Sequence, residues 1–368
     1  MKNMRLAYLG EQSHHYDNLR SHLGRVGIDI PTLNVPAYMA REEGRVRNKR
    51  PTLLGRTCNR VKHVCSQIHG VLDKEYENRL IRTIDEQDIG YVLAYWGTNP
   101  LAEIIAIKKR RPHVKVILNV LCHPLGLSRA KIYLQNRLMR HALQFLDGLI
   151  FPSQTMVSYF ASRIFNGSHV ASLVLPPLFG ESFHPRHRLP ECPHQPSLIF
   201  LGRMDWWDGQ STDNVLSIID QLIQQKIHVF HSDKTGSFPH HPFRHTFAPM
   251  PMHELAAYST QFDASLVVYE TGACECDDRF RNTVPDRFLM SVAAGVPIAI
   301  PRDGYDACKE ILRNYRAVFE YDSYGKLYDQ LSDRGRVARM RAVACENRRL
   351  YDEDAYVFRM IDFLESLC

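Results

Sequence analysis

The sequence has no long apolar run. No stretch approaches the roughly 20 apolar residues that a membrane-spanning helix needs. The first ten residues hold only a short apolar run at positions 6–9, which is too short for the core of a signal peptide. The nine cysteines are odd in number and scattered, which fits reduced thiols better than a disulfide framework. The sequence therefore favours a cytoplasmic protein.

Metal-ligand spacings are also scarce. Cys274 and Cys276 form a lone C-x-C pair, and no second pair follows at the spacing of a zinc site. We therefore expect no bound metal. The sequence has no internal repeat and no low-complexity tract, which argues against repeat architectures and against long disordered segments.

The amount and distribution of charge are informative. The 368 residues are too many for one ordinary core and predict about two domains. A net charge of +6 conceals a division between the halves. Residues 1–180 carry 25 Lys and Arg against 13 Asp and Glu, a net +12, whereas residues 181–368 carry 21 against 27, a net −6. A basic half joined to an acidic half indicates that the halves meet different ligands.

Short apolar runs alternate with amphipathic stretches along most of the chain. This alternation predicts parallel sheets covered by helices on both faces. We expect strands at residues 5–9, 28–35, 91–95, 116–121, 148–151, 198–201, 227–231, 264–269, 297–300 and 317–320. We expect helices at residues 16–26, 75–87, 101–109, 132–145, 215–224, 254–259, 285–294 and 354–367.

The pattern breaks between residues 175 and 198, where six prolines occur without periodicity. We interpret residues 177–197 as a linker between a first domain, 1–176, and a second, 198–350. The fold class is then α/β, with two tandem Rossmann-like, doubly wound parallel sheets. Ligands of such sheets bind at the carboxyl ends of the strands, so we expect the site in the cleft between the two domains.

Three segments of the second half carry a family resemblance. They are FLGRMD at 200–205, DASLVVY at 263–269 and PDRFLMSVAAGVP at 285–297. In the first half, residues 116–123 and 147–153 add a strand ending in His and an aspartate–strand–serine segment. In this order they resemble the GT-B glycosyltransferases, especially the large retaining family that includes sucrose synthase and the phosphatidylinositol mannosyltransferases.

The resemblance implies transfer of a sugar from a nucleotide-activated donor without a metal and with retention of configuration. It assigns the donor to the second domain and a glycan or lipid-linked acceptor to the first, as in the synthesis of surface polysaccharides. It also implies that residues 351–368 form a helix that crosses back to the first domain. The donor-binding residues that it implies are Gly202, Arg203, Met250, Met252, Asn282, Asp286 and Arg287.

Two arginines fit this chemistry physically. Cleavage of the sugar–phosphate bond builds negative charge on the leaving diphosphate, which fixed cations and helix N-termini stabilise. Arg203 follows a predicted strand, and Arg287 opens a predicted helix, so both can present a bidentate fork. The alternative is that each is a surface ion-pair residue.

The sequence also departs from the family pattern. Asp208 stands where the family has a Lys, and Asn282 and Met290 stand where it has two Glu residues. A different donor, a different use of the two arginines or a catalytically inactive binding protein would each fit these departures. Glu270, Asp277, Asp278 and Asp286 are nearby carboxylates that could replace the lost ones.

His123 follows a predicted strand, at the position of a family His that faces the donor sugar. It is the candidate catalytic residue, as a base or hydrogen-bond partner near neutral pH. The alternative is a histidine that only caps a loop.

The positive charge of the first half is clustered at residues 41–62, 108–115 and 129–140. Basic segments with apolar residues interspersed attract anionic lipid. We therefore expect a peripheral contact with an anionic membrane face or an acidic glycan, or else a merely solvated basic surface. A nucleic-acid partner is not expected, because no nucleic-acid-binding motif is present.

Overall fold

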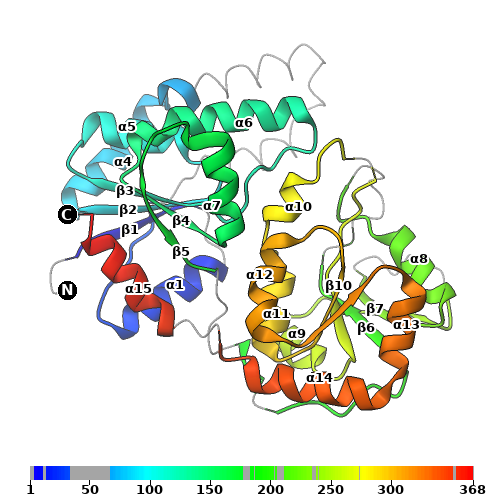
Figure 1. Cartoon of the computed structure of the whole chain (residues 1–368). Coiled ribbons are helices and arrows are strands. Elements are labelled where there is room, and N and C mark those ends of the chain that lie inside the picture. The colour runs from blue at the N-terminus through cyan, green and yellow to red at the C-terminus, as the bar shows by residue number, and fades with distance from the viewer. Residues whose placement is uncertain are drawn as a thin grey trace. The chain divides into compact units, whose positions relative to one another are not determined.

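The computed structural model describes residues 4–10, 14–33, 67–176, 183–185, 187–202, 204, 211–233, 238, 240–272, 274–350 and 354–367. The chain divides into two compact units (Figure 1). Unit 1 comprises Met1–Leu175 and Val357–Cys368, and unit 2 comprises Pro176–Tyr356. No helix in the described ranges has the length and apolar character needed to cross a membrane.

Unit 1 is built on a parallel sheet with the strand order β1-β2-β3-β4-β5. Its strands are β1 (Leu6–Leu9), β2 (Tyr91–Tyr95), β3 (Lys115–Asn119), β4 (Gly148–Phe151) and β5 (Ala171–Val174). Its helices are α1 (His14–Arg25), α4 (Lys74–Glu86), α5 (Leu101–Arg110), α6 (Arg129–Ala142), α7 (Gln154–Phe160) and α15 (Asp354–Glu365), with the short segments η1 (Leu143–Phe145) and η2 (Ala161–Phe165).

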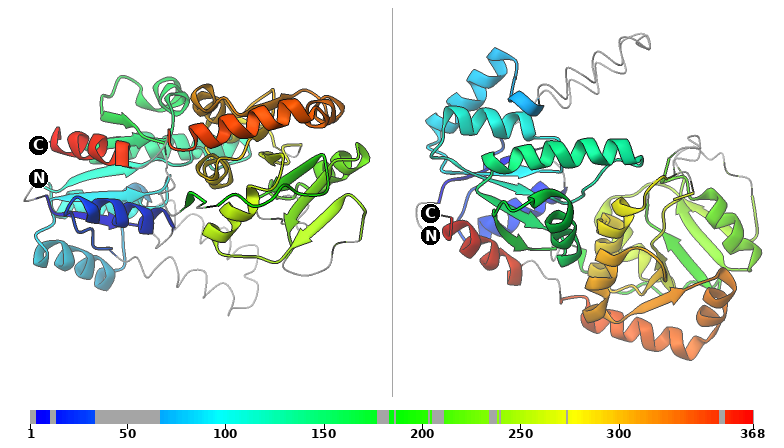
Figure 2. Two further views of the ribbon diagram at one scale, coloured as in Figure 1. Left: turned by 90° about the horizontal axis from the view of Figure 1, so that it is seen from below. Right: turned by 45° about the horizontal axis from the view of Figure 1, so that its top comes forward.

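Alternate residues of each strand feed two separate cores, because successive side chains of a strand point to opposite faces. On β1, Ala7 and Leu9 join the core formed with α4, α5, α6 and α7. Leu6 and Tyr8 join the core formed with α1 and α15. Both faces are therefore apolar and covered by helices, as two further views show (Figure 2).

The C-terminal helix α15 belongs to unit 1. Val357, Met360, Ile361 and Leu364 are buried in the same core as Leu93 of β2. A Cβ on Gly148 would lie 3.0 Å from Cζ of Phe363, so glycine lets the helix approach β4. Apolar burial therefore fixes the end of the chain on the first sheet.

Unit 2 contains a second parallel sheet, with the order β11-β10-β9-β6-β7-β8. Its strands are β6 (Ser197–Phe200), β7 (His228–Ser232), β8 (Arg244–Phe247), β9 (Ala264–Leu266), β10 (Ile298–Pro301) and β11 (Val318–Tyr321). Its helices are α8 (Leu216–Gln224), α9 (Met252–Ser259), α10 (Asp278–Asn282), α11 (Asp286–Ala294), α12 (Asp306–Tyr315), α13 (Tyr324–Ser332) and α14 (Arg334–Asn347).

The segment predicted as a linker falls within unit 2, which comprises Pro176–Tyr356. Its described residues from 187 to 197 are folded onto unit 2 rather than free between the units. Cys192 is buried and its backbone N–H donates to the carbonyl of Gln261 at 2.9 Å. Nη2 of Arg188 donates to the carbonyl of Gly295 at 2.5 Å. Proline density here marks an irregular but packed segment.

The strand predicted at 28–35 also differs. Within its described residues, Thr32 makes only an isolated parallel bridge with Tyr8. The N–H of Tyr8 donates to Pro31 at 2.9 Å, and the N–H of Leu33 donates to Tyr8 at 2.8 Å. This segment therefore lies on the edge of β1 that β2 does not occupy.

Candidate functional site

The strand order of unit 2 reverses at one place. From β6 the chain moves outward through β7 and β8, then returns to β9 on the other side of β6. Ligands of open α/β sheets bind where the order reverses, at the carboxyl ends of the two strands that diverge there. The candidate site is therefore the edge formed by Leu201 and Gly202 after β6 and by the residues that follow β9. We call it the donor edge.

Arg287, in the first turn of α11, reaches this edge. Its Nη2 donates to the carbonyl of Val268 at 2.8 Å, and its Nη1 pairs with Oδ1 of Asp213 at 3.4 Å. Its guanidinium carbon lies 4.0 Å from the ring centroid of Tyr269 and 5.1 Å from that of Phe200. The side chain is only 8% exposed. Arg287 is thus a buried cation held by aromatic faces rather than a free surface fork.

Gly202 is required by this arrangement. A Cβ at this position would lie 2.4 Å from Cζ of Phe200 and 2.7 Å from Nη1 of Arg287. The glycine therefore lets the backbone after β6 approach the guanidinium closely. The next predicted ligand, Arg203, lies outside the described residues, as does Asp208.

Asp286 is the first residue of α11, directly after Pro285. An acidic residue at a helix N-terminus interacts favourably with the positive end of the helix dipole. The nearby Glu270 is a preorganised carboxylate. Its Oε2 accepts from Oγ of Ser217 at 2.7 Å, and its Oε1 accepts from the N–H of Gly272 at 2.9 Å. Glu270 follows β9 and lies at the donor edge.

Two further predicted ligands lie at the start of α9. Met252 is its first residue and packs against the core that contains α11. Met250 lies in the segment between β8 and α9 and is half-buried. The backbone of this segment leads from the carboxyl end of β8 into a helix whose side chains contact those of α11.

Asn282 and Met290 stand where the resemblance implies two glutamates. The Nδ2 of Asn282 donates to the carbonyl of Asp278 at 2.7 Å, one turn back in α10, and the residue is 4% exposed. Met290 is buried in the hydrophobic core beneath α11. The structure therefore places neither of these side chains in the open at the donor edge.

His123, the candidate catalytic residue, lies in the interior of unit 1. Its side chain is fully buried, and its Nε2 lies 2.8 Å from Oδ1 of Asn136. Asn136 Nδ2 in turn donates to the hydroxyl of Tyr159 at 3.0 Å, and the ring of Phe160 lies 5.3 Å away. Burial lowers the pKa of His123 to about 4, so the ring is neutral at pH 7. Its role as a catalytic base or hydrogen-bond partner stays a prediction, and the described contact is the hydrogen bond with Asn136.

The aromatic part of the donor edge is not among the residues predicted from the sequence. Tyr269, Phe200 and Tyr305 surround or adjoin Arg287, and the hydroxyl of Tyr305 accepts from the N–H of Tyr269 at 2.9 Å. The rings of Tyr269 and Tyr305 are stacked 6.3 Å apart. The signal in the sequence is an aromatic residue at the end of each of two apolar segments, Phe200 and Tyr269.

Unit 1 has an edge of the same kind. The segment at Thr32 and strand β2 lie on opposite sides of β1, so the order of extended segments reverses at β1. The rings of Tyr8 and Tyr95 lie 4.7 Å apart there, and Trp96, directly after β2, is 40% exposed. We call these residues the aromatic edge of unit 1.

Comparison with known proteins identifies the fold. No protein-family model and no curated protein matches the sequence. Among solved structures, sucrose-phosphate synthase from Thermosynechococcus elongatus matches at 10% identity and a TM-score of 0.65, over 99% of each chain. HepE from Anabaena in complex with UDP-glucose matches at 12% identity and a TM-score of 0.62, over 99% of this chain and 100% of that one. The spinosyn forosaminyltransferase SpnP matches at 12% identity and a TM-score of 0.52, over 99% of this chain and 100% of that one. The chain thus has the GT-B fold of these glycosyltransferases.

Proposed function

We propose that this protein is a glycosyltransferase that takes a sugar from a nucleotide-activated donor. The observation that carries the proposal is the juxtaposition of Arg287, Gly202 and the N-terminus of α11 where the strand order of unit 2 reverses. HepE, which has the same fold, binds UDP and UDP-glucose in its solved structures. We propose a nucleotide sugar as the ligand of the donor edge on this basis.

The charge at the donor edge suits a leaving diphosphate. Arg287 is enclosed by aromatic rings and shielded from water, so its charge acts at a lower effective dielectric than a surface arginine would. The Asp213 carboxylate now lies 3.4 Å from it. We propose that the diphosphate meets the field of Arg287 and the α11 N-terminus, with Arg203 supplying a second cation and the backbone of Met250–Met252 contacting the base. These protein groups would stabilise the leaving group without a metal.

A carboxylate partner for the sugar is also proposed. Asn282 and Met290 supply no carboxylate, but Glu270 does, and two hydrogen bonds already orient it at the donor edge. An oriented carboxylate accepts hydrogen bonds from sugar hydroxyls more strongly than a neutral group does. We propose that Glu270 takes this role, with Asp286 as the alternative, and that transfer proceeds with retention of configuration.

We assign the acceptor to unit 1. Its aromatic edge offers exposed Trp96 beside Tyr95, and aromatic faces suit the apolar faces of sugar rings. The buried His123 would act here through Asn136 and the local loop structure rather than by direct proton transfer to solvent. A glycan or lipid-linked acceptor, as used in polysaccharide synthesis, is our proposal for the substrate class.

A membrane-held acceptor would be reached through α6. Tyr133 is 65% exposed and Leu134 is 41% exposed on this helix, beside the basic residues Lys131 and Arg137. The basic cluster at residues 108–115 is less available to an anionic membrane, because several of its members form ion pairs within unit 1. Lys108 pairs with Asp147 at 2.9 Å, Arg110 pairs with Glu77 at 3.2 Å, and Arg111 pairs with Asp85. The cluster at 41–62 lies outside the described residues.

Donor binding is tested by a thermal-shift panel of UDP-, GDP-, ADP-, CDP- and dTDP-sugars. Binding of the true donor to the folded state alone raises the free energy of unfolding by mass action, by about 2.7 kcal/mol at a donor concentration of 100 times the dissociation constant. The melting temperature rises accordingly. The same panel is run on Arg203→Ala, with the exposed Arg302→Ala as matched control. If the donor shifts Arg203→Ala as strongly as the parent, the phosphate role of Arg203 is wrong. If no nucleotide sugar shifts the parent protein, the proposed function fails.

The burial of Met290 favours a second candidate, a GT-B protein that binds a nucleotide sugar but does not transfer it. The panel separates the two when combined with an assay of donor hydrolysis. Slow release of the free nucleoside diphosphate supports the enzyme. A thermal shift with no hydrolysis and no transfer supports the binding protein.

A further inference from the structure

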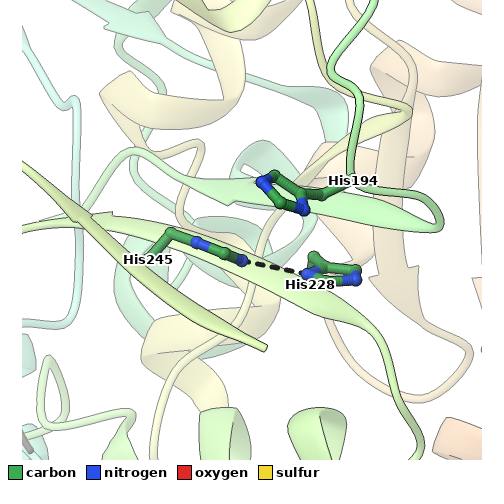
Figure 3. A group of neighbouring side chains, drawn as sticks. All are labelled: His194, His228 and His245. Atoms are coloured by element: carbon green, nitrogen blue, oxygen red, sulfur yellow. Dashed lines mark hydrogen bonds between the residues drawn. The ribbon is translucent and has the colours of Figure 1, made fainter. Parts of the chain in front are cut away.

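Three histidines gather at the end of the second sheet that is opposite to the donor edge. His228 is the first residue of β7, His245 is the second residue of β8, and His194 lies three residues before β6 (Figure 3). Because all strands of this sheet are parallel, these positions share its amino-terminal end. The donor edge lies at the carboxyl end. This group, the histidine cluster, therefore has no place in the proposed sugar transfer.

The ring nitrogens of the cluster converge. One nitrogen of each ring lies within 4.8 Å of the chosen nitrogens of the other two. Nδ1 of His228 and Nε2 of His245 are 2.9 Å apart and share a hydrogen bond. The His194 ring centroid lies 4.7 Å from that of His245 and 4.9 Å from that of His228. Three nitrogens bound tetrahedrally to one zinc ion are about 3.4 Å apart, which is within the range of the cluster. The ring planes lie within 33° of one another, so the rings must turn for their lone pairs to meet at one ion.

The sheet holds two of the rings firmly. His245 pairs with Phe230 in the β7–β8 register, and the two rings are stacked 4.3 Å apart. Phe230 is in turn packed 4.5 Å from Phe262. His228 pairs with Ser197 of β6. Sites on strands are positioned more accurately than sites on loops, and here only His194 comes from an irregular segment.

The chemistry of the cluster fits a metal of borderline softness. Metal-binding imidazoles must be neutral. In the hydrogen bond between Nδ1 of His228 and Nε2 of His245, the accepting nitrogen carries no proton, so at least that ring is neutral. Imidazole nitrogen suits zinc, copper and nickel, whereas magnesium and calcium prefer oxygen. In the unliganded cluster one imidazole N–H lies between His228 and His245. Metal binding would move that proton to the other nitrogen of the same ring, a change of tautomer without a change of charge.

We propose that His194, His228 and His245 bind one zinc-type divalent ion through three imidazole nitrogens, with water in the fourth position. The expected role is structural. β8 is the outermost strand of its sheet, and His194 precedes the central strand β6. An ion shared by these three segments would fasten the edge strand and the proline-rich segment to β7. Binding of the ion to the folded state alone would then stabilise unit 2.

The test uses the full chain without any histidine tag, treated with chelator and then titrated with zinc chloride in a calorimeter. We expect one saturable equivalent per chain and a higher melting temperature with zinc but not with magnesium. His194→Ala changes an exposed side chain and should leave the fold intact while weakening zinc binding by at least about tenfold. His253→Ala, also exposed and in the same unit, should bind zinc like the parent.

Two results would overturn the proposal. One is the absence of a saturable equivalent in the parent protein. The other is unchanged affinity in His194→Ala and in the more conservative variants His228→Gln and His245→Gln, whose fold is checked by circular dichroism. Nucleotide-sugar binding is measured separately on the same preparations. Failure of the zinc site therefore leaves the proposed function untouched, and the reverse also holds.

Discussion

Gly202 and Arg287 are in such close contact that a methyl group at position 202 would lie 2.7 Å from Nη1 of the arginine. The two residues are far apart in sequence and come from different elements, the end of β6 and the start of α11. Their contact links β6, where the strand order of the sheet reverses, to α11, whose N-terminus lies at the donor edge.

Gly202→Ala should displace the guanidinium or the ring of Phe200, whose Cζ would be 2.4 Å from the added carbon. We expect a loss of about 1–3 kcal/mol of stability, as for other overpacked sites, together with weaker donor binding. Urea unfolding and the nucleotide-sugar thermal shift measure the two effects. Gly24→Ala is the control, since a Cβ there meets nothing within 4 Å and lies within helix α1. Wild-type donor affinity in Gly202→Ala would contradict the prediction.

Arg287→Lys should weaken donor binding although the charge is kept. Lysine lacks the planar fork that contacts both Val268 and Asp213, and it stacks less well on Tyr269. We expect at least about a tenfold rise in the dissociation constant of the donor, which corresponds to ~1.4 kcal/mol. Calorimetry with the nucleotide sugar provides the measurement, and Arg302→Lys on the surface is the control. An unaltered dissociation constant would show that only charge matters at this position.

Glu270→Gln should reduce affinity for the sugar part of the donor. The substitution retains the shape of the side chain but removes the charge that strengthens hydrogen bonds from hydroxyl groups. Affinity for the nucleotide sugar should fall about tenfold or more, while affinity for the free nucleoside diphosphate should change little. Asp303→Asn, at an exposed position, is the control. Equal losses for both ligands would indicate a general disturbance of the edge instead of a contact with the sugar.

Acidification should destabilise the protein through His123. Its pKa is lowered to about 4 in the folded state by burial, against about 6.5 when unfolded, so the unfolded state binds more protons between these values. Stability is therefore complete above about pH 6.5 and falls by on the order of 3 kcal/mol as the pH approaches 4. His231, whose pKa is also lowered by burial, acts in the same direction.

The histidine contribution is isolated with His123→Gln, which can still donate to Asn136 but does not titrate. The free energy of unfolding of this variant should fall less between pH 7 and pH 4 than that of the parent. His169→Gln changes an exposed histidine and should reproduce the parent curve. An imidazole resonance of His123 that titrates near pH 6.5 in the folded protein would refute the prediction.

Asp263→Ala should unfold unit 2 more readily. The carboxylate is 2% exposed, accepts from the N–H of Ser197 at 2.8 Å and pairs with Arg334 at 2.8 Å. Its removal leaves the Ser197 N–H without this acceptor and should cost about 3–5 kcal/mol in denaturant unfolding. Asp303→Asn again serves as control. A loss below about 1 kcal/mol would show that water or a nearby group replaces the carboxylate.

The aspartate–strand segments show what sequence reasoning could and could not provide. Asp147, before β4, accepts from the N–H of Val116 at 2.8 Å, and Asp263, before β9, accepts from Ser197 in the same way. The motif was visible in the sequence, but its role, joining neighbouring strands, required the fold. β5 and β8 were not predicted. Both are edge strands whose side chains are only partly buried, and three of the four residues of β8 are polar, so it has no apolar run.

The sequence by itself predicted those strands that are buried on both faces and the helices between them, because their apolar pattern is local. It also identified the segments that carry the likeness to GT-B glycosyltransferases. The tertiary structure decided the rest. It enclosed His123 and Met290, put Arg287 between aromatic rings, and brought together three histidines from positions 194, 228 and 245. Burial and proximity of this kind depend on strand order and register, which are set by contacts between distant parts of the chain.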